Sequence, residues 1–336
     1  MKNTKLILIA FALMSLLSAH KAHAITISPV RFELQADPGG AVGGQIILNN
    51  EQNETKTLYS STANFEAQGE TGTPAFVDAK NDLGKWITLN ESVTLAPNES
   101  KVVPFSISVP KDAEAGGHFA AIFWSDQPTV PGQVTIGAKI GTLVLLSVSG
   151  DIKESGGVSD FQAKNGQTRF SSLPVTFNYR FQNGGNDRVK PTGVISVKNM
   201  LGFVSANISA NPVEGNVLPR SIRKFESEWQ GHGSHALSSN DLSKISDENF
   251  FAKATREYHN FALGRYTAHL DISYGTKGDH STATYVFYVF PWHFLIVFGV
   301  SILLVLFFFT WGIKSYNKML IRKFQQSSHS TEEPKI

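Results

Sequence analysis

The sequence predicts an all-β exported region, made of two antiparallel β-sandwich domains in tandem and followed by a single transmembrane α-helix. Three observations support this fold: an apolar leader, short β-rich runs separated by turn residues over most of the 336 residues, and one long uncharged segment near the C-terminus. The expected parts are a signal peptide at 1–24, a first domain at 25–152, a second domain at 153–290, a transmembrane helix at 291–313 and a basic tail at 314–336.

The segment from Trp292 to Ile313 is predicted to cross a membrane, because it carries no formal charge. At a rise of about 1.5 Å per residue, its roughly 22 residues span about 33 Å, enough for the hydrocarbon core of a bilayer. Trp292 and Trp311 occupy positions typical of interfacial aromatic residues, and Lys314 and Lys318 follow at once. These four residues are the expected membrane-interface anchors. The basic residues place 25–290 outside the cell and the tail in the cytoplasm.

The N-terminus has the pattern of a secretory signal. Lys2 and Lys5 precede the apolar run 6–17, and Ala22-His23-Ala24 matches the small-x-small cleavage pattern, so cleavage is expected after Ala24. An uncleaved anchor is the alternative, but the apolar run is short for a membrane span.

Composition narrows the class of protein. Cysteine is absent, so the exported domains must be held by apolar cores alone, which fits a bacterial surface. The net charge is +2 and no basic cluster stands out in the exported part, which argues against a nucleic-acid partner. We expect no cofactor.

Short strands and turns fill the first domain. The runs 25–34, 43–50 and 57–67 are β-rich, and the turns Asp37–Gly40 and Asn49–Asn53 separate them. A polar loop follows, and two strands then flank the turn Pro97-Asn98-Glu99. The runs 116–125 and 139–150 complete an antiparallel sandwich.

The second domain follows the polar linker 151–157 and shows clear alternation. Val175, Phe177, Tyr179 and Phe181 share one face of a strand. The same parity recurs where Tyr266, Ala268, Leu270, Ile272 and Tyr274 face inward. A helical insertion is predicted near 240–262, with Ser246 as its N-cap. It either closes one end of the sandwich or forms a partner-binding lid.

Neither a catalytic site nor a metal site is predicted, so an enzyme is not expected. His232 and His235 form an H-x-x-H pair, but they lie in a Gly/Ser loop without a third histidine nearby. The sequence has no nucleophile elbow, P-loop or dinucleotide fingerprint. His118 follows two glycines at the start of a strand, where a hydrogen-bonded structural histidine is expected.

Several motifs of the first domain resemble those of the bacterial WxL-interacting surface proteins. They are the leading strand S-P-V-R-F-E-L, the stretch VTLAPNESKVVPFSISVP, Gly116-Gly117-His118-Phe119 and Lys139-Ile140-Gly141. The resemblance implies two immunoglobulin-like domains before a C-terminal membrane helix. It also implies that the first domain is associated with peptidoglycan and the second with host or protein ligands.

Two functions of different classes follow. The first is a non-enzymatic, membrane-anchored scaffold or adhesin that binds cell-wall polymer or another surface protein. The alternative is a membrane-tethered chaperone or assembly factor for surface subunits, which acts through strand pairing at a sheet edge. A long, uncharged and unprotected edge strand would favour the alternative.

The candidate partner-binding residues come from two strands that are apolar on both faces, 119–124 and 140–148. A sandwich sheet needs only one apolar face. Ile122, Trp124, Leu143 and Leu145 are therefore predicted to form an apolar patch outside the core, and such patches mark interaction sites. The alternative is that the second domain or the loop 68–85 covers this patch.

Overall fold

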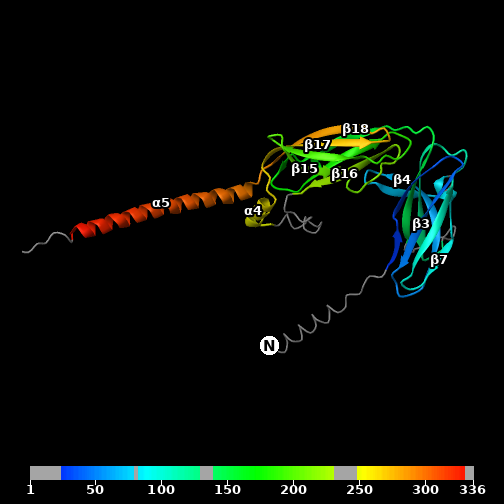
Figure 1. Ribbon diagram of the computed structural model, residues 1–336, viewed down its shortest axis with the longest axis horizontal. Helices are drawn as coiled ribbons and strands as arrows, with labels where there is room; N and C mark the ends of the chain where they lie inside the picture. The colour runs from blue at the N-terminus through cyan, green and yellow to red at the C-terminus, as the bar shows by residue number, and fades with distance from the viewer. Residues whose placement is uncertain (1–23, 79–81, 129–138, 231–247, 330–336) are drawn as a thin grey trace, which may run out of the picture. The chain divides into compact units, whose positions relative to one another are not determined.

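The computed structural model describes residues 24–78, 82–128, 139–230 and 248–329, which form two compact units (Figure 1). The first unit contains the described residues up to Gly157, together with Gln182–Lys190 and Asn216–Arg223. The second contains Val158–Phe181, Pro191–Gly215 and the described chain from Lys224 onward. Strands are the commonest secondary structure in both units, so the predicted all-β fold class is confirmed.

One sheet of the first unit has the strand order β1-β3-β8-β6, with antiparallel pairing throughout. Its strands are β1 (Ile25–Ser28), β3 (Ala41–Asn50), β8 (Ser100–Ser108) and β6 (Ile87–Leu89). The predicted turn before β3 contains Gly39 at a φ of 80°, a conformation that strains residues with a side chain. The Gly39 N–H donates to the Val109 carbonyl over 3.1 Å, which closes the turn against the end of β8.

The other sheet of the first unit has the order β2-β10-β9-β4-β5, and β7 also pairs with β4. Its strands are β2 (Arg31–Ala36), β10 (Lys139–Val148), β9 (Gly116–Ser125), β4 (Lys56–Gln68), β5 (Thr73–Val77) and β7 (Ser92–Leu95). β2 runs parallel to β10, whereas the other pairings are antiparallel. The prediction of a loop over 68–85 is wrong in part, because β5 and the short helix α2 (Leu83–Trp86) form there.

Apolar side chains of the two sheets meet in the core of the first unit. Each strand contributes every second residue, as the two-residue period requires. The central members are Ile46 and Leu48 of β3, Val103, Phe105 and Ile107 of β8, Ala120, Ile122 and Trp124 of β9, and Val144, Leu146 and Val148 of β10. Full burial of one such large side chain contributes about 1.5–3 kcal/mol, so this core stabilises the unit without disulfides.

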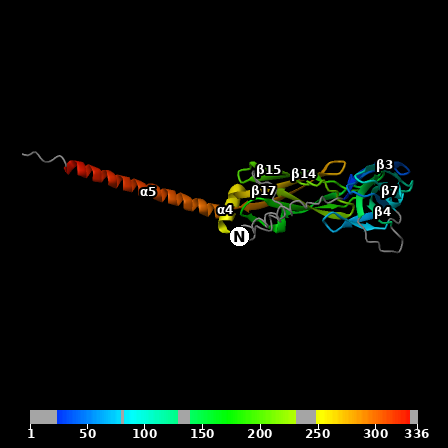
Figure 2. The same cartoon turned by 90° about the horizontal axis from the view of Figure 1, so that it is seen from below.

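The second unit also has two sheets, with the orders β11-β13-β16 and β12-β18-β17-β14-β15. The first comprises β11 (Gly156–Ala163), β13 (Val175–Asn183) and β16 (Ser221–Trp229), and η1 (Lys164–Gly166) follows β11. The second comprises β12 (Arg169–Phe170), β18 (Asp279–Val289), β17 (Gly264–Tyr274), β14 (Thr192–Asn199) and β15 (Val204–Ser209). Figure 2 shows β14, β15 and β17 in one layer.

The alternation predicted for the second unit is confirmed in both of its sheets. Val175, Phe177, Tyr179 and Phe181 of β13 are buried, and so are Tyr266, Ala268, Leu270 and Ile272 of β17. Phe177 and Tyr266 each pack against Phe287 of β18, with ring centroids 5.4 and 5.7 Å apart. The periodicity therefore predicted the inward face of each strand correctly.

Two helices end the chain. α4 (Phe250–His259) confirms the helical insertion, but it begins later than predicted, because the N-cap is Asn249, whose side chain accepts from the Ala252 N–H. Ser246 and the H-x-x-H pair lie outside the described residues. α5 (Trp292–His329) includes the segment Trp292–Arg322, the one helix of the described chain that is long and apolar enough to cross a membrane. Trp292, Trp311, Lys314 and Lys318 lie exposed on it.

Candidate functional site

The four predicted partner-binding residues do not form one exposed patch, so this prediction is wrong in its geometry. The β9–β10 register places Ile122 opposite Thr142 and Trp124 opposite Ile140, whereas Leu143 and Leu145 lie opposite Ala121 and Phe119. Directly opposite residues share a face. Ile122 and Trp124 therefore face the core between the sheets, each with 0% exposure, and Leu143 and Leu145 lie on the outer face.

The outer face of β9 and β10 is nevertheless apolar, as the sequence predicted. Phe65, Phe119 and Leu145 form a second buried cluster there, and Leu143 and Leu218 pack against it. Phe65 comes from β4, and Leu218 comes from the segment 216–223 that belongs to the first unit. Phe65 and Leu218 thus cover part of the predicted patch, and the sequence pattern did not indicate either residue.

An aromatic pair extends this outer face toward solvent. Phe76 of β5 is 48% exposed, and its ring lies 4.9 Å from that of Phe123 in an edge-to-face arrangement. The Phe123 side chain lies over Gly141, where a Cβ would come within 2.7 Å of the ring. An exposed aromatic pair joined to a buried apolar cluster is the kind of surface that marks an interaction site. We call the exposed Phe76 and the partly buried Phe123 and Leu143 the outer apolar face.

A small pocket of about 70 Å³ adjoins the outer apolar face. Its apolar wall is formed by Phe65, Leu143, Leu145, Leu218 and Ile222, and its polar wall includes Arg31, Arg223 and Asn216. Mostly apolar walls with a few oriented polar groups are typical of binding pockets. The pocket therefore suits an apolar side chain that lies next to a negatively charged or carbonyl group.

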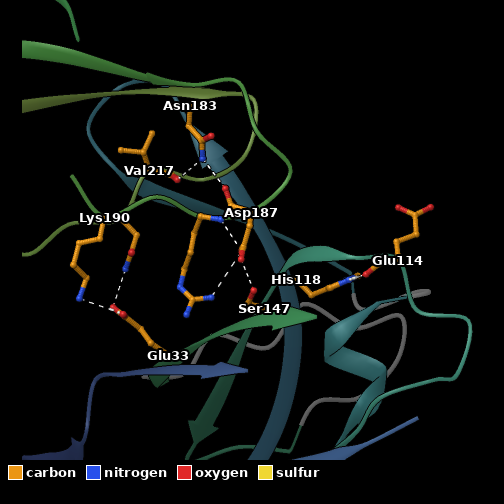
Figure 3. A network of polar contacts seen from close by, with 10 residues as sticks. Glu33, Glu114, His118, Ser147, Asn183, Asp187, Lys190 and Val217 are labelled. Carbon is orange, nitrogen blue, oxygen red and sulfur yellow. Dashed lines mark hydrogen bonds and ion pairs between the residues drawn. The ribbon is translucent and has the colours of Figure 1, made fainter. Parts of the chain in front are cut away.

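A polar network fixes the wall of this pocket, and Glu33 of β2 is its centre (Figure 3). One Glu33 oxygen lies 3.0 Å from Arg31 Nε and accepts from Asn216 Nδ2 over 2.9 Å, and the other lies 3.2 Å from Lys190 Nζ. Burial alone would raise the pKa of Glu33. The hydrogen bonds from Asn216 and Lys190 and the charges of Lys190 and Arg31 outweigh it, so the pKa lies below its ordinary value.

A second part of the same network holds the segment 182–190 (Figure 3). The Asp187 carboxylate accepts from the Ser147 hydroxyl of β10 and from the Arg188 N–H over 2.7 Å. The Asn183 side chain donates to the Asp187 and Val217 carbonyls over 2.7 and 2.9 Å. The Ser147–Asp187 bond attaches the segment 182–190 to β10, and the Asn183–Val217 bond joins that segment to 216–223. These bonds satisfy polar groups that burial would otherwise leave without partners.

His118 is the structural histidine that the sequence predicted. Its Nδ1 lies 2.6 Å from Asp82 Oδ1, and its Nε2 lies 2.8 Å from the Glu114 carbonyl oxygen. Burial alone would lower the pKa of His118. The hydrogen bonds to Asp82 and Glu114, with the negative charges of both residues, outweigh burial and raise the pKa above its ordinary value. Both ring nitrogens can donate only in the charged form, which these acceptors favour.

The free energy of unfolding of the first unit is therefore expected to fall as the pH rises from mildly acidic to mildly basic values. Because the folded-state pKa of His118 is raised above 6.5, its contribution is complete below about pH 6.5 and is lost as pH rises through the folded value. Urea unfolding of the full chain in detergent at pH 6 and pH 9, followed by tryptophan fluorescence, measures this loss. The His118→Gln variant should show less pH dependence, whereas the exposed control His280→Gln should behave like the parent. Equal pH dependence in all three proteins would contradict the assignment.

The start of β10 offers a short free edge. β2 pairs with Leu143–Val148, and within the described residues no strand pairs with Lys139–Gly141 on that side. The outer strands of the first unit are short, with four residues in β1, three in β6, six in β2 and five in β5. The sequence criterion of a long unprotected edge is therefore not met in this unit, and beside the outer apolar face the unpaired part of β10 is Lys139–Gly141.

The remaining predicted features lie partly outside the described chain. The signal peptide and the residues before its cleavage point at Ala24 are not described, and the same holds for His232 and His235. Among the residues that are described, no group of three His, Cys, Asp or Glu side chains is placed to hold a metal ion. The absence of a metal site at the histidine pair therefore stays a prediction.

No family model matches the chain, and no curated protein matches it. Among solved structures, the class 5 fimbriae chaperone CfaA is similar at 12% identity and a TM-score of 0.37, covering 79% of this chain and 99% of that chain. The E. coli chaperone DraB has 9% identity and a TM-score of 0.30, with coverage of 80% and 98%. The Pseudomonas aeruginosa chaperone CupB2 has 8% identity and a TM-score of 0.31, with coverage of 77% and 98%. At such low TM-scores these likenesses carry no argument, and the resemblance to the WxL-interacting proteins stays a prediction.

Proposed function

We propose that this chain is a membrane-anchored, non-enzymatic assembly factor that holds an extended segment of another surface protein on its first unit. The observation that carries the proposal is the outer apolar face, where Phe76 is half exposed on a sheet whose other face already forms the core. The outer face of a sandwich sheet is ordinarily polar. A segment with apolar side chains would remove this surface from water.

The neighbouring groups favour a polypeptide. The free edge Lys139–Gly141 presents backbone groups to an added strand, which is how sheet edges bind extended peptides. The adjoining pocket takes an apolar side chain of that peptide, with Arg31 beside it. Lys139 Nζ lies 6.0 Å from the centre of the Phe123 ring, so a second cation borders the outer apolar face.

The charges that flank the membrane helix indicate on which side of the membrane the two units lie. Lys314 and Lys318 follow the apolar part of α5, whereas Lys277 is the sole basic residue among the roughly twenty that precede Trp292 when histidine is excluded. We therefore place both units outside the cytoplasm and the C-terminal tail inside. The peptide would come from an exported protein.

A scaffold or adhesin that binds cell-wall polymer is the second candidate. The Phe76–Phe123 pair favours it, because exposed aromatic rings also stack on the apolar faces of sugar rings. This candidate uses the same surface as the first. The chemical nature of what is captured there decides between them.

Site-specific crosslinking at Phe76 is expected to capture an exported protein. A photoreactive amino acid is placed at position 76 of the full chain in the native cells, and the captured species is identified by mass spectrometry. Val102 is the matched control, because it is also exposed but lies on β8 in the other sheet. A charge in the outer apolar face, as in Leu143→Asp, should reduce capture at position 76 at least tenfold, since it places an unpaired charge among apolar groups.

The possible outcomes separate the proposals. Captured protein at position 76 and none at position 102 supports the assembly role, and captured glycan supports the adhesin. Equal capture at both positions, or none at either, would overturn both candidates. A cytoplasmic protein captured at position 76 would contradict the topology.

A further inference from the structure

The end of the second unit from which α5 emerges carries a set of exposed apolar side chains. The turn between β14 and β15 exposes Met200, Leu201, Phe203 and Val204, which we call the apolar tip. Gly202 at its centre has a φ of 85°, which allows the tight turn. A turn in a water-exposed loop is ordinarily polar, so this tip requires an apolar environment that the described unit does not provide.

The strand register places the apolar tip at the same end of the unit as the start of α5. Asn199 of β14 pairs with Tyr266 of β17, and Gly264 pairs with Val289, the last residue of β18. Met200 Sδ lies 3.7 Å from the point where a Cβ on Gly264 would stand. The tip therefore lies beside the strand ends that lead through Phe290 into Trp292.

α4 lies at this end of the unit (Figure 1), and it adds a second set of exposed apolar side chains. Phe251 and Tyr258, seven residues apart on one helix face, are exposed, and so is Phe261. The rings of Tyr258 and Phe261 lie 5.6 and 5.8 Å from the ring of Phe294. Because Phe294 lies in the first turn of the membrane-spanning segment, both rings are level with the point where the chain enters the lipid.

We propose that the second unit docks on the membrane surface, with the apolar tip and the exposed face of α4 inserted at the interface beside α5. The occupant is the lipid bilayer, because these surfaces are continuous with a helix whose own exposed side chains require lipid. Interfacial helices with aromatic residues bind bilayers in this way. The inference requires that α5 crosses a bilayer, and it does not depend on peptide capture by the first unit.

The proposal assigns two membrane contacts besides the span and so restricts how the second unit can tilt. A unit held only by α5 could rotate about the entry point of the helix. With the apolar tip and α4 inserted as well, the second unit would contact the membrane at places separate from the entry point of α5.

The chain lacks cysteine, so a single introduced cysteine can report lipid contact. Three full-length variants are labelled with an environment-sensitive fluorophore: Leu201→Cys in the tip, Val213→Cys beyond the opposite end of β15, and Val305→Cys within α5. Leu201 and Val213 are 72% and 67% exposed, so the two labels are matched and neither removes a core contact. Each variant is placed in phosphatidylcholine nanodiscs at one chain per disc, with or without brominated acyl chains as quenchers.

Brominated lipid should quench the labels at 305 and 201 and leave the label at 213 unchanged. Quenching at 305 without quenching at 201 would show that the span is present and that docking of the tip is wrong. Equal quenching at 201 and 213 would also overturn the proposal, because the contact would not be confined to the tip. No quenching at 305 would refute the span itself. Shielding at 201 that appears only with several chains per disc would identify a second copy as the occupant and exclude lipid.

Discussion

Replacing Trp124 with alanine is expected to destabilise the first unit severely. The side chain is fully buried in the core, on the face of β9 that meets the other sheet. Truncation of a buried aromatic side chain to alanine costs about 3–5 kcal/mol, since it removes apolar contacts and leaves a cavity. Such a loss is a large part of the roughly 5–15 kcal/mol that holds a typical domain folded. Deuterium exchange of the full chain in detergent should therefore become more than about a hundredfold faster in β9 and β10.

Phe76→Ala is the matched control, since it truncates an aromatic side chain on the same sheet. Phe76 is half exposed, so about 1 kcal/mol or less should be lost. The two variants should also differ in function, because Phe76→Ala removes part of the outer apolar face while the fold persists. If Trp124→Ala exchanged as slowly as Phe76→Ala, the assignment of Trp124 to the core would be wrong.

The misplacement of Trp124 shows which part of this structure the sequence could predict. Within one strand, the two-residue period assigns each side chain to a face, and this was sufficient for β13 and β17. Between strands, the shared face depends on register, which the connecting loop and the partner strands determine. A shift of one residue between β9 and β10 separates Ile122 from Leu143, although both strands were predicted correctly.

The rest of the candidate site depends on contacts between distant parts of the chain. Glu33 receives its hydrogen bond from Asn216, at a separation of 183 residues. Phe76 comes from a segment that the Gly and Thr content suggested to be a loop, although the run Thr73–Val77 contains β-forming residues. That run lacks a two-residue alternation and contains Pro74, so the sequence pattern gave no clear strand signal for β5. No local pattern could have predicted that the segments 182–190 and 216–223 belong to the first unit.

The Glu257→Ala variant is expected to release α4 from the membrane helix. Glu257 is fully buried, its Oε1 lies 2.6 Å from His293 Nδ1, and its Oε2 accepts from the Phe294 N–H over 2.9 Å. The carboxylate therefore satisfies an amide in the first turn of α5, where helix geometry leaves amides without partners. Removing the carboxylate leaves the His293 ring and the Phe294 N–H without their acceptor, and a buried polar group left without a partner costs about 1–3 kcal/mol.

Local unfolding is the expected result, because α4 has 10 residues and a helix of that length is marginal in water without tertiary contacts. Deuterium exchange in 250–259 should approach that of an unfolded segment, while β17 and β18 keep their protection. Glu257→Gln retains an oxygen that can accept from Phe294 and should have a smaller effect. Glu228→Ala, at an exposed position on β16, should have none. Unchanged protection of α4 in Glu257→Ala would show that ring contacts with Phe294 and Trp292 hold the helix without the carboxylate.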